Sequence, residues 1–136
     1  MPQFFNQPDW IFHHRRFALI SRVAQGTAAE TLALRYLEAR GLLLEARNFR
    51  CRGGELDLIM RDGEHLVFVE VRSRHDARYG VPAESVTRTK QHRLLRAATS
   101  YLQRRPSDQP CRFDVVAILQ SDDAPHIEWI QDAFQS

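Results

Sequence analysis

The sequence predicts a three-layer α/β fold in which helices cover a central sheet, with the element order α-β-β-β-α-β-β. Two observations lead to it. Amphipathic helix patterns occur at residues 27–40 and at about 87–104. Strand-like apolar runs fill the interval between them and follow the second one. A chain of 136 residues is long enough for one domain with a sizeable core, and helices interleaved with strands pack onto the faces of one sheet.

The first residues are predicted to form an N-terminal arm, residues 1–22, ahead of the domain at 23–136. Pro2, Asn6 and Pro8 interrupt this stretch, and its apolar groups are short. The pattern favours a mobile arm or a short docking helix.

The first helix is predicted at residues 27–40, with Thr27 as its N-cap and Glu30 three residues later, as in a capping box. Gly41 follows as the C-terminal stop. Capping is one explanation for Glu30. The other is a site role, because apolar residues three, four and seven positions further on place Glu30 at the edge of the buried face.

A strand at about residues 42–49 leads into a hairpin whose strands lie near 55–60 and 66–72. Asp62-Gly63 between two such runs is a strong hairpin signal. With Asp62 and Gly63 as the loop residues, Glu55 directly faces Glu70, and Asp57 lies on the diagonal. Alternation also puts these three acids on one face of the sheet, with Leu56 and Leu58 together on the other.

The three carboxylates indicate a hard divalent cation, which prefers oxygen ligands. The alternative is a solvated acidic face above an apolar one. Residues 66–71 are nearly continuously apolar, which is typical of a central strand buried on both faces, and a buried acid needs a partner.

The second helix is predicted to begin after Ser85 or Thr87 and to end near Arg104. Lys90 stands four residues before the apolar Leu94, so it points inward near the helix start. The alternative is a lysine that flanks the core and extends to solvent. The preceding loop, residues 73–83, either clamps a phosphate backbone or is only a connection.

The last part of the chain is predicted to add a strong strand at 113–119 and a short one at 127–130. Phe134 is expected to pack back onto the fold.

The charge is unevenly distributed although the formal net charge is only +2. Residues 47–105 contain 13 Lys or Arg and 7 Asp or Glu, and 18 of the 19 cations of the chain are Arg. Arginine suits bidentate phosphate contacts, so this segment favours a nucleic acid as partner. GC-rich coding is an alternative explanation for the residue type but not for its placement.

Cys51 and Cys111 are the only cysteines, and neither has a second Cys or His at zinc-ligand spacing. Two cysteines do not form a disulfide framework, so a reducing, cytoplasmic location is expected. No apolar run reaches the ~20 residues of a membrane helix, and no signal peptide is recognisable, so no membrane partner is expected.

Glu30 on a helix, Asp57 on a strand and Glu70-Val71-Arg72 on the next strand resemble the PD-(D/E)xK nuclease superfamily. Within it the chain resembles the YraN-like family of bacterial proteins, which are similar to archaeal Holliday-junction resolvases. The resemblance covers about residues 24–134. It is carried by Gly26, Glu30, Ala33, Tyr36, Leu37, Gly41, Asn48, Arg50, Gly54–Ile59, Phe68–Arg72, Arg74, Lys90, Arg93, Tyr101, Leu102, Arg112–Val115, Ala133 and Phe134.

The resemblance implies a restriction-endonuclease-like fold with a mixed central sheet. It also implies Mg²⁺ or Mn²⁺ held by Asp57, Glu70 and the Val71 carbonyl, with Glu30 completing or supporting the site. The superfamily usually has Lys where this chain has Arg72, and arginine cannot act as a base. Arg72 is expected to hold a phosphate, and Lys90 to substitute in space for the missing lysine.

The expected activity is metal-dependent hydrolysis of phosphodiester bonds in structured DNA, by a possible homodimer. The expected nucleic-acid contacts are Arg50, Arg52, Arg74, Arg78 and Arg93. One alternative is a nucleic-acid-binding module without catalysis. Another is a protein-interaction role for the N-terminal arm and for the acidic C-terminal segment, residues 113–136, which contains five Asp or Glu and no Lys or Arg.

Overall fold

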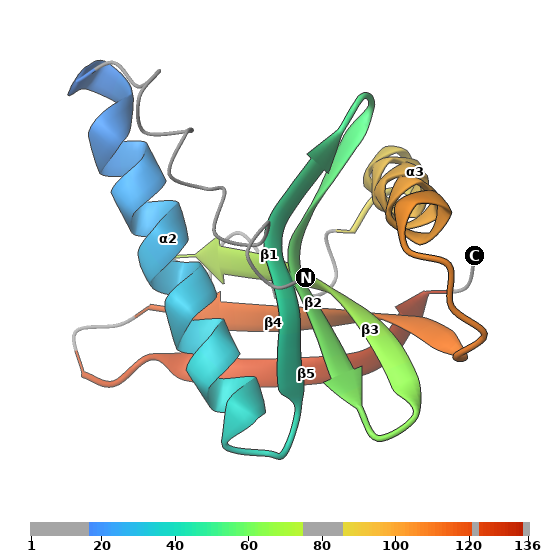
Figure 1. Ribbon diagram of the computed structural model, residues 1–136. Coiled ribbons are helices and arrows are strands. Elements are labelled where there is room, and N and C mark those ends of the chain that lie inside the picture. The colour runs from blue at the N-terminus through green and yellow to red at the C-terminus, as the bar shows by residue number, and fades with distance from the viewer. Residues whose placement is uncertain (1–16, 75–85, 121–122, 135–136) are drawn as a thin grey trace.

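The computed structural model describes residues 17–74, 86–120 and 123–134. Its element order is the predicted α-β-β-β-α-β-β, with a sheet between two helices (Figure 1). In chain order the elements are α2 (Phe17–Glu38), β1 (Leu43–Cys51), β2 (Gly54–Asp62), β3 (His65–Arg74), α3 (Arg88–Arg104), β4 (Cys111–Leu119) and β5 (His126–Phe134).

The five strands lie in the sheet in sequence order, β1-β2-β3-β4-β5. Neighbours are antiparallel except β3 and β4, which are parallel and are joined through α3. The sheet is therefore mixed, and the predicted restriction-endonuclease-like fold is confirmed. β3 is the central strand, and the run from Leu66 to Glu70 is buried at every position, as predicted for a strand covered on both faces.

Each face of the sheet has its own hydrophobic core. α2 packs Ala33 and Leu37 against one face, and α3 packs Leu94 and Tyr101 against the other (Figure 1). On the α3 side a row of aromatic rings crosses the sheet from edge to edge. It comprises Phe49, Tyr101, Phe68, Phe113 and Phe134, with neighbouring centroids 4.7 to 6.2 Å apart. The expected packing of Phe134 back onto the fold is thereby confirmed.

The first helix begins earlier than predicted, so the capping box is wrong. α2 starts at Phe17, and Thr27 and Glu30 lie in its interior. Because the helix continues through Gly26, the backbone N–H groups near Thr27 belong to the helix interior and need no cap. Its end is as predicted: Gly41 has a φ of +96°, and the N–H of Leu42 donates to the Leu37 carbonyl, as in a Schellman motif.

The hairpin between β2 and β3 uses a different turn from the predicted one. Asp62 pairs with His65, so Gly63 and Glu64 are the loop residues and the predicted register is wrong by two residues. Gly63 occupies the first loop position with a φ of +60°, as a type II′ turn requires. A shift of two residues does not by itself move a side chain to the other face of the sheet, but it changes the cross-strand partner.

The second helix begins as predicted after Thr87, whose hydroxyl accepts a hydrogen bond from the Lys90 N–H at 3.1 Å. The final strand, β5, is longer than the predicted 127–130. Ser85 and most of the 73–83 loop lie outside the described residues, as does the arm up to residue 16; α2 runs through the expected boundary at residue 22. No helix in the described part of the chain is long and apolar enough to cross a membrane.

Candidate functional site

Asp57 lies where β2 and β3 separate. Their pairing ends at Leu58 and Val69, and beyond it the Val71 N–H donates to Asp57 Oδ2 at 2.8 Å. The carboxylate thus accepts a hydrogen bond that a strand carbonyl would otherwise receive. The alternation of β2 breaks here too, because Leu56 packs in the α3-side core and Leu58 in the α2-side core. The predicted common face for Leu56 and Leu58 is therefore wrong.

Asp57 and Glu70 lie next to each other at this separation. Continuing the β2–β3 register by one step places them opposite each other, and Glu70 is only 6% exposed. Burial raises the pKa of Asp57 well above its usual range. The Glu70 charge raises that pKa further, whereas the hydrogen bond from Val71 lowers it. Two carboxylates at such a position favour sharing a proton or a cation.

Lys90 reaches this acid pair from the first turn of α3. Its Nζ lies 3.3 Å from Oε2 of Glu70, which confirms that Lys90 points inward. The lysine side chain is 30% exposed and the glutamate side chain 7%, so the ion pair sits at the edge of the interior. The ammonium group of Lys90 therefore compensates the negative charge of Glu70, one of the two neighbouring carboxylates.

Glu30 approaches the same region from α2. Burial raises its pKa, while Arg47 and the Asn48 side chain lower it. Its charge in turn contributes to the raised pKa of Asp57. Arg47 Nη2 lies 3.9 Å from Glu30 Oε1, too far for a hydrogen bond, and that oxygen is buried without a hydrogen-bond partner in the described structure. Its place in the interior of α2 excludes the capping role of Glu30.

Glu55 does not join the acid pair as the predicted register required. It lies opposite Arg50 of β1, with 3.5 Å between the Arg50 Nε and Glu55 Oε2 atoms. Because the register differs by two residues from the predicted one, Asp57 rather than Glu55 lies opposite Glu70. Across residues 17–74, 86–120 and 123–134, no three His, Cys, Asp or Glu side chains gather as a metal-binding group. The expected cluster of three carboxylates is therefore a pair.

Arg72 follows Glu70 by two residues on β3, so alternation places both side chains toward the same face. It is half-buried. Val71 contributes its N–H to Asp57, as described above. β3 thus supplies an acid, a backbone donor and a guanidinium within three consecutive residues.

The predicted nucleic-acid contacts do not form one cluster. Arg50 is exposed and paired with Glu55, and Arg93 is exposed on α3. Arg74 is half-buried at the end of β3. Arg78 lies outside the described residues. Among the predicted contacts in the described part of the chain, Arg52 lines a groove.

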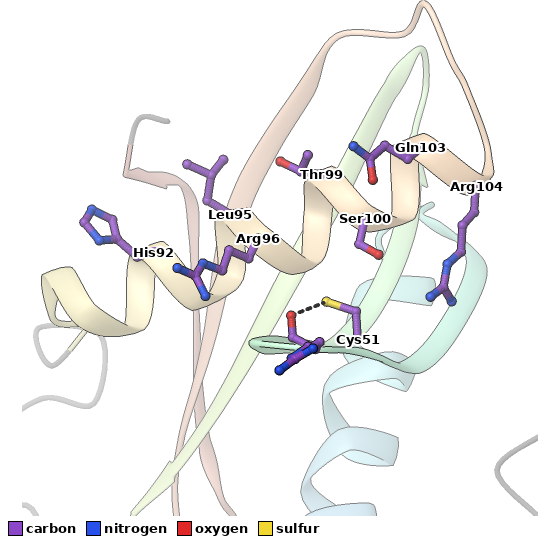
Figure 2. A pocket seen from close by; sticks show the side chains of 9 residues that line it. Cys51, His92, Leu95, Arg96, Thr99, Ser100, Gln103 and Arg104 are labelled. Carbon is purple, nitrogen blue, oxygen red and sulfur yellow. Dashed lines mark hydrogen bonds between the residues drawn. The ribbon is translucent and has the colours of Figure 1, made fainter.

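That groove has a volume of about 560 Å³ and lies between α3 and the end of β1 (Figure 2). The sequence did not predict this groove. The sequence feature that could have indicated the groove is the row of polar and charged side chains at helical spacing along one flank of α3. The described lining residues are Cys51, Arg52, His92, Leu95, Arg96, Thr99, Ser100, Gln103 and Arg104.

A further buried acid, Asp114 on β4, has a structural role. Arg112 binds its carboxylate through Nε and Nη2, at 3.0 to 3.2 Å. The Trp129 indole and the Asp132 N–H donate to the same carboxylate at 2.9 and 3.0 Å. Arg112 also contacts Asp62 at 2.7 Å. These bonds satisfy Asp114, so it is not available to a ligand.

The comparison with known proteins identifies the family. The pattern described as "Uncharacterised protein family UPF0102" matches residues 29–118. The chain belongs to the UPF0102 family. This agrees with the family resemblance drawn from the motif residues, and the matched range includes Glu30, Asp57, Glu70 and Lys90.

Three UPF0102 proteins illustrate the similarity. That of Nitrosococcus oceani is 53% identical over 113 residues, which cover 82% of this chain and 91% of the relative. That of Ralstonia pickettii is 54% identical over 116 residues, covering 82% and 90%. That of Hahella chejuensis is 49% identical over 118 residues, covering 85% and 94%. UPF0102 membership thus extends over most of the chain.

Proposed function

We propose that this UPF0102 protein is a metal-dependent nuclease that hydrolyses phosphodiester bonds in structured DNA. One observation carries the proposal: Asp57 and Glu70 are neighbours on separating strands, with the pKa of Asp57 raised by burial and by the Glu70 charge. Perturbed carboxyl groups of this kind are concentrated at functional sites.

The donor set fits Mg²⁺ or Mn²⁺. Mg²⁺ is commonly bound by one or two carboxylates and completes its shell with water and substrate phosphate. Asp57 and Glu70 would be the two carboxylates, and the Val71 carbonyl a further ligand. A divalent cation held there would lower the pKa of a bound water molecule and would stabilise the leaving oxygen of a phosphodiester.

The surrounding side chains of the chain have distinct roles in this proposal. Lys90 keeps positive charge beside Glu70, 3.3 Å away. Arg72 holds a non-bridging phosphate oxygen, because its guanidinium stays protonated and donates in a planar fork. Glu30 supports the site from α2, where its Oε1 is buried without a hydrogen-bond partner in the described structure. A positioned lysine and arginine stabilise charge on a phosphate in the transition state.

A second function is a nucleic-acid-binding module without catalysis. Arg72 favours it, since the position has no deprotonable amine. The presence of an acid pair rather than a three-carboxylate group favours it as well. In this alternative the protein binds DNA through its arginine side chains. Asp57 and Glu70 then have only a structural role, at the point where β2 and β3 separate.

Cleavage assays separate the two functions. Labelled four-way junction, flap, duplex and single-stranded DNA are incubated with Mn²⁺ or Mg²⁺ and with the wild type, Asp57→Asn or Glu70→Gln. Glu64→Gln is the matched control, because Glu64 is an exposed acid in the hairpin loop. Cleavage by the wild type and Glu64→Gln, with a loss of at least ~10²-fold in both site variants, supports the nuclease.

If none of the four DNA substrates is cleaved with either metal, the proposal of a nuclease is rejected. Salt-dependent DNA binding that survives Asp57→Asn then supports the binding module. Loss of metal-free binding in that variant, while Glu64→Gln still binds, contradicts the module as well.

A further inference from the structure

The flank of α3 that faces the end of β1 forms a basic groove, defined here by Arg52, Arg96, Arg104 and His92 with their neutral neighbours. Its nine described lining residues include three arginines and no Asp or Glu. The hydroxyl and amide groups of Thr99, Ser100 and Gln103 add hydrogen-bonding capacity. A volume of about 560 Å³ is within the range of about 300–1,000 Å³ for ligand sites.

The two walls of the groove are held together closely. A Cβ added at Gly54 would lie 2.1 Å from the Arg93 carbonyl oxygen, so α3 and the start of β2 meet backbone to backbone. Gly53, with a φ of +92°, leaves room for the Arg96 side chain, whose Nη1 would lie 3.0 Å from a Cβ there. The close backbone contact requires glycine at position 54, and the left-handed φ favours glycine at position 53.

Two of the arginines lie along the same flank of α3. Arg96 and Arg104 extend from α3 toward the side where Cys51 ends β1 (Figure 2). The Arg104 guanidinium lies 5.3 Å from the centroid of the Phe49 ring, which restricts its movement. Arg96 and Arg104 are about two helical turns apart along α3 and line the same groove.

The length of the groove matches a nucleic-acid strand. From His92 to Arg104 the helix advances about 18 Å at ~1.5 Å per residue. A strand of B-form DNA advances about 3.4 Å per base pair, so roughly five steps fit along the groove. No Phe, Tyr or Trp is among its described lining residues, so the groove lacks the large aromatic rings on which the bases of a single strand commonly stack.

We propose that this groove binds the sugar-phosphate backbone of one strand of duplex DNA without reading its sequence, a role that deepens the proposed function and rests on it. The groove and the acid pair lie near the same end of α3, on different sides of the helix, because Lys90 contacts Glu70 and His92 follows it by two residues. A strand lying along α3 toward its first turn is led to the acid pair. The groove is thus the surface that holds the substrate, and Asp57 and Glu70 are where it would be cut.

The test measures binding of a fluorescently labelled duplex by anisotropy, in EDTA, between about 50 and 200 mM salt. The groove variant is Arg52→Gln combined with Arg96→Gln. The control is Arg35→Gln combined with Arg61→Gln, which removes the same charge at two exposed positions outside the groove. The groove variant should bind about tenfold or more weakly at low salt, with a salt slope smaller by about two, since each phosphate contact contributes ~0.9.

Three further measurements sharpen the result. Arg96→Lys should keep most of the salt slope, because it retains the charge. A single strand of the same length should bind more weakly than the duplex, since no Phe, Tyr or Trp among the described lining residues offers its bases a stacking platform. Melting curves confirm that each variant is folded.

Equal losses in the groove and control variants, or tighter binding of the single strand, overturn the groove assignment whether or not cleavage occurs. The nuclease proposal fails separately, in the metal-containing assay with Asp57→Asn. Absence of cleavage together with selective loss of binding in the groove variant leaves the groove established and the nuclease rejected.

Discussion

The Val71 N–H donates to Asp57 Oδ2 at 2.8 Å, beyond the last pair of the β2–β3 ladder. A side-chain carboxylate here takes a hydrogen bond that normally joins two strands. The separation of β2 and β3 and the position of Asp57 are therefore one structural feature. Changes at Asp57 should alter stability and ion binding together.

Asp57→Asn should raise the free energy of unfolding above neutral pH. The pKa of Asp57 is raised in the folded state, so folding favours its protonated form. The resulting stability is present below the unfolded pKa and is lost as pH rises through the folded pKa. Asparagine is neutral and its amide oxygen still accepts from Val71, so the gain at pH 8 should be on the order of 1 kcal/mol.

Urea unfolding between pH 4 and pH 8 measures this effect. The wild type should lose more stability than Asp57→Asn over that interval. Parallel stability profiles for the two proteins would contradict a raised pKa at Asp57.

Binding of Mn²⁺ or Mg²⁺ should strengthen as pH rises, if the proposed metal site is correct. The ion needs ionised carboxylates, and the pKa of Asp57 is raised, so binding must release a proton. Calorimetry in buffers of different ionisation enthalpy measures the proton release. Asp57→Asn and Glu70→Gln should each abolish the binding, whereas an unchanged isotherm in both would place the ion elsewhere.

Lys90→Gln should destabilise the fold by about 1–3 kcal/mol at neutral pH. It leaves the Glu70 carboxylate, whose side chain is 7% exposed, without the ammonium 3.3 Å away. The same change should tighten Mn²⁺ binding, because it removes a cation beside the proposed site. Lys90→Arg retains the charge and should behave closer to the wild type in both measurements. A Lys90→Gln protein with wild-type stability would show that this ion pair contributes nothing.

Gly54→Ala should be far more damaging than Gly63→Ala. An added Cβ at Gly54 would lie 2.1 Å from the Arg93 carbonyl oxygen, so α3 must move, at a cost of about 3 kcal/mol or more. At Gly63 nothing lies within 4 Å, and only the φ of +60° opposes alanine, at about 1 kcal/mol. Thermal unfolding of both variants measures the difference. Similar melting temperatures would show that α3 adjusts freely.

Arg112→Gln should destabilise the fold by about 3–5 kcal/mol, because Asp114 is 1% exposed and would lose its cation. The Trp129 indole donates to the same carboxylate at 2.9 Å, so tryptophan emission reports the change. Asp62→Asn, at a side chain 35% exposed, should cost about 1 kcal/mol or less. Comparable unfolding midpoints for the two variants would contradict a network centred on Asp114.

The sequence predicted most local features correctly because they depend on near neighbours. The apolar run from Leu66 identified the central strand, and Thr87 identified the start of α3. The inward direction of Lys90 followed from helical periodicity. The turn was mistaken because Asp62-Gly63 and Gly63-Glu64 are both acceptable loop pairs, and the choice depends on how the whole strands pair.

The sequence by itself determined the α/β class, the order of its elements and the face of the sheet on which Asp57 and Glu70 lie, since periodicity and turn residues act locally. Only the tertiary structure decided that Glu55 turns to Arg50 and that Asp57 takes its place beside Glu70. It alone showed the basic groove, because β1 and α3 are brought together by packing across about 40 residues of intervening chain. Register and long-range packing depend on the sum of many weak contacts, which no short stretch of sequence contains.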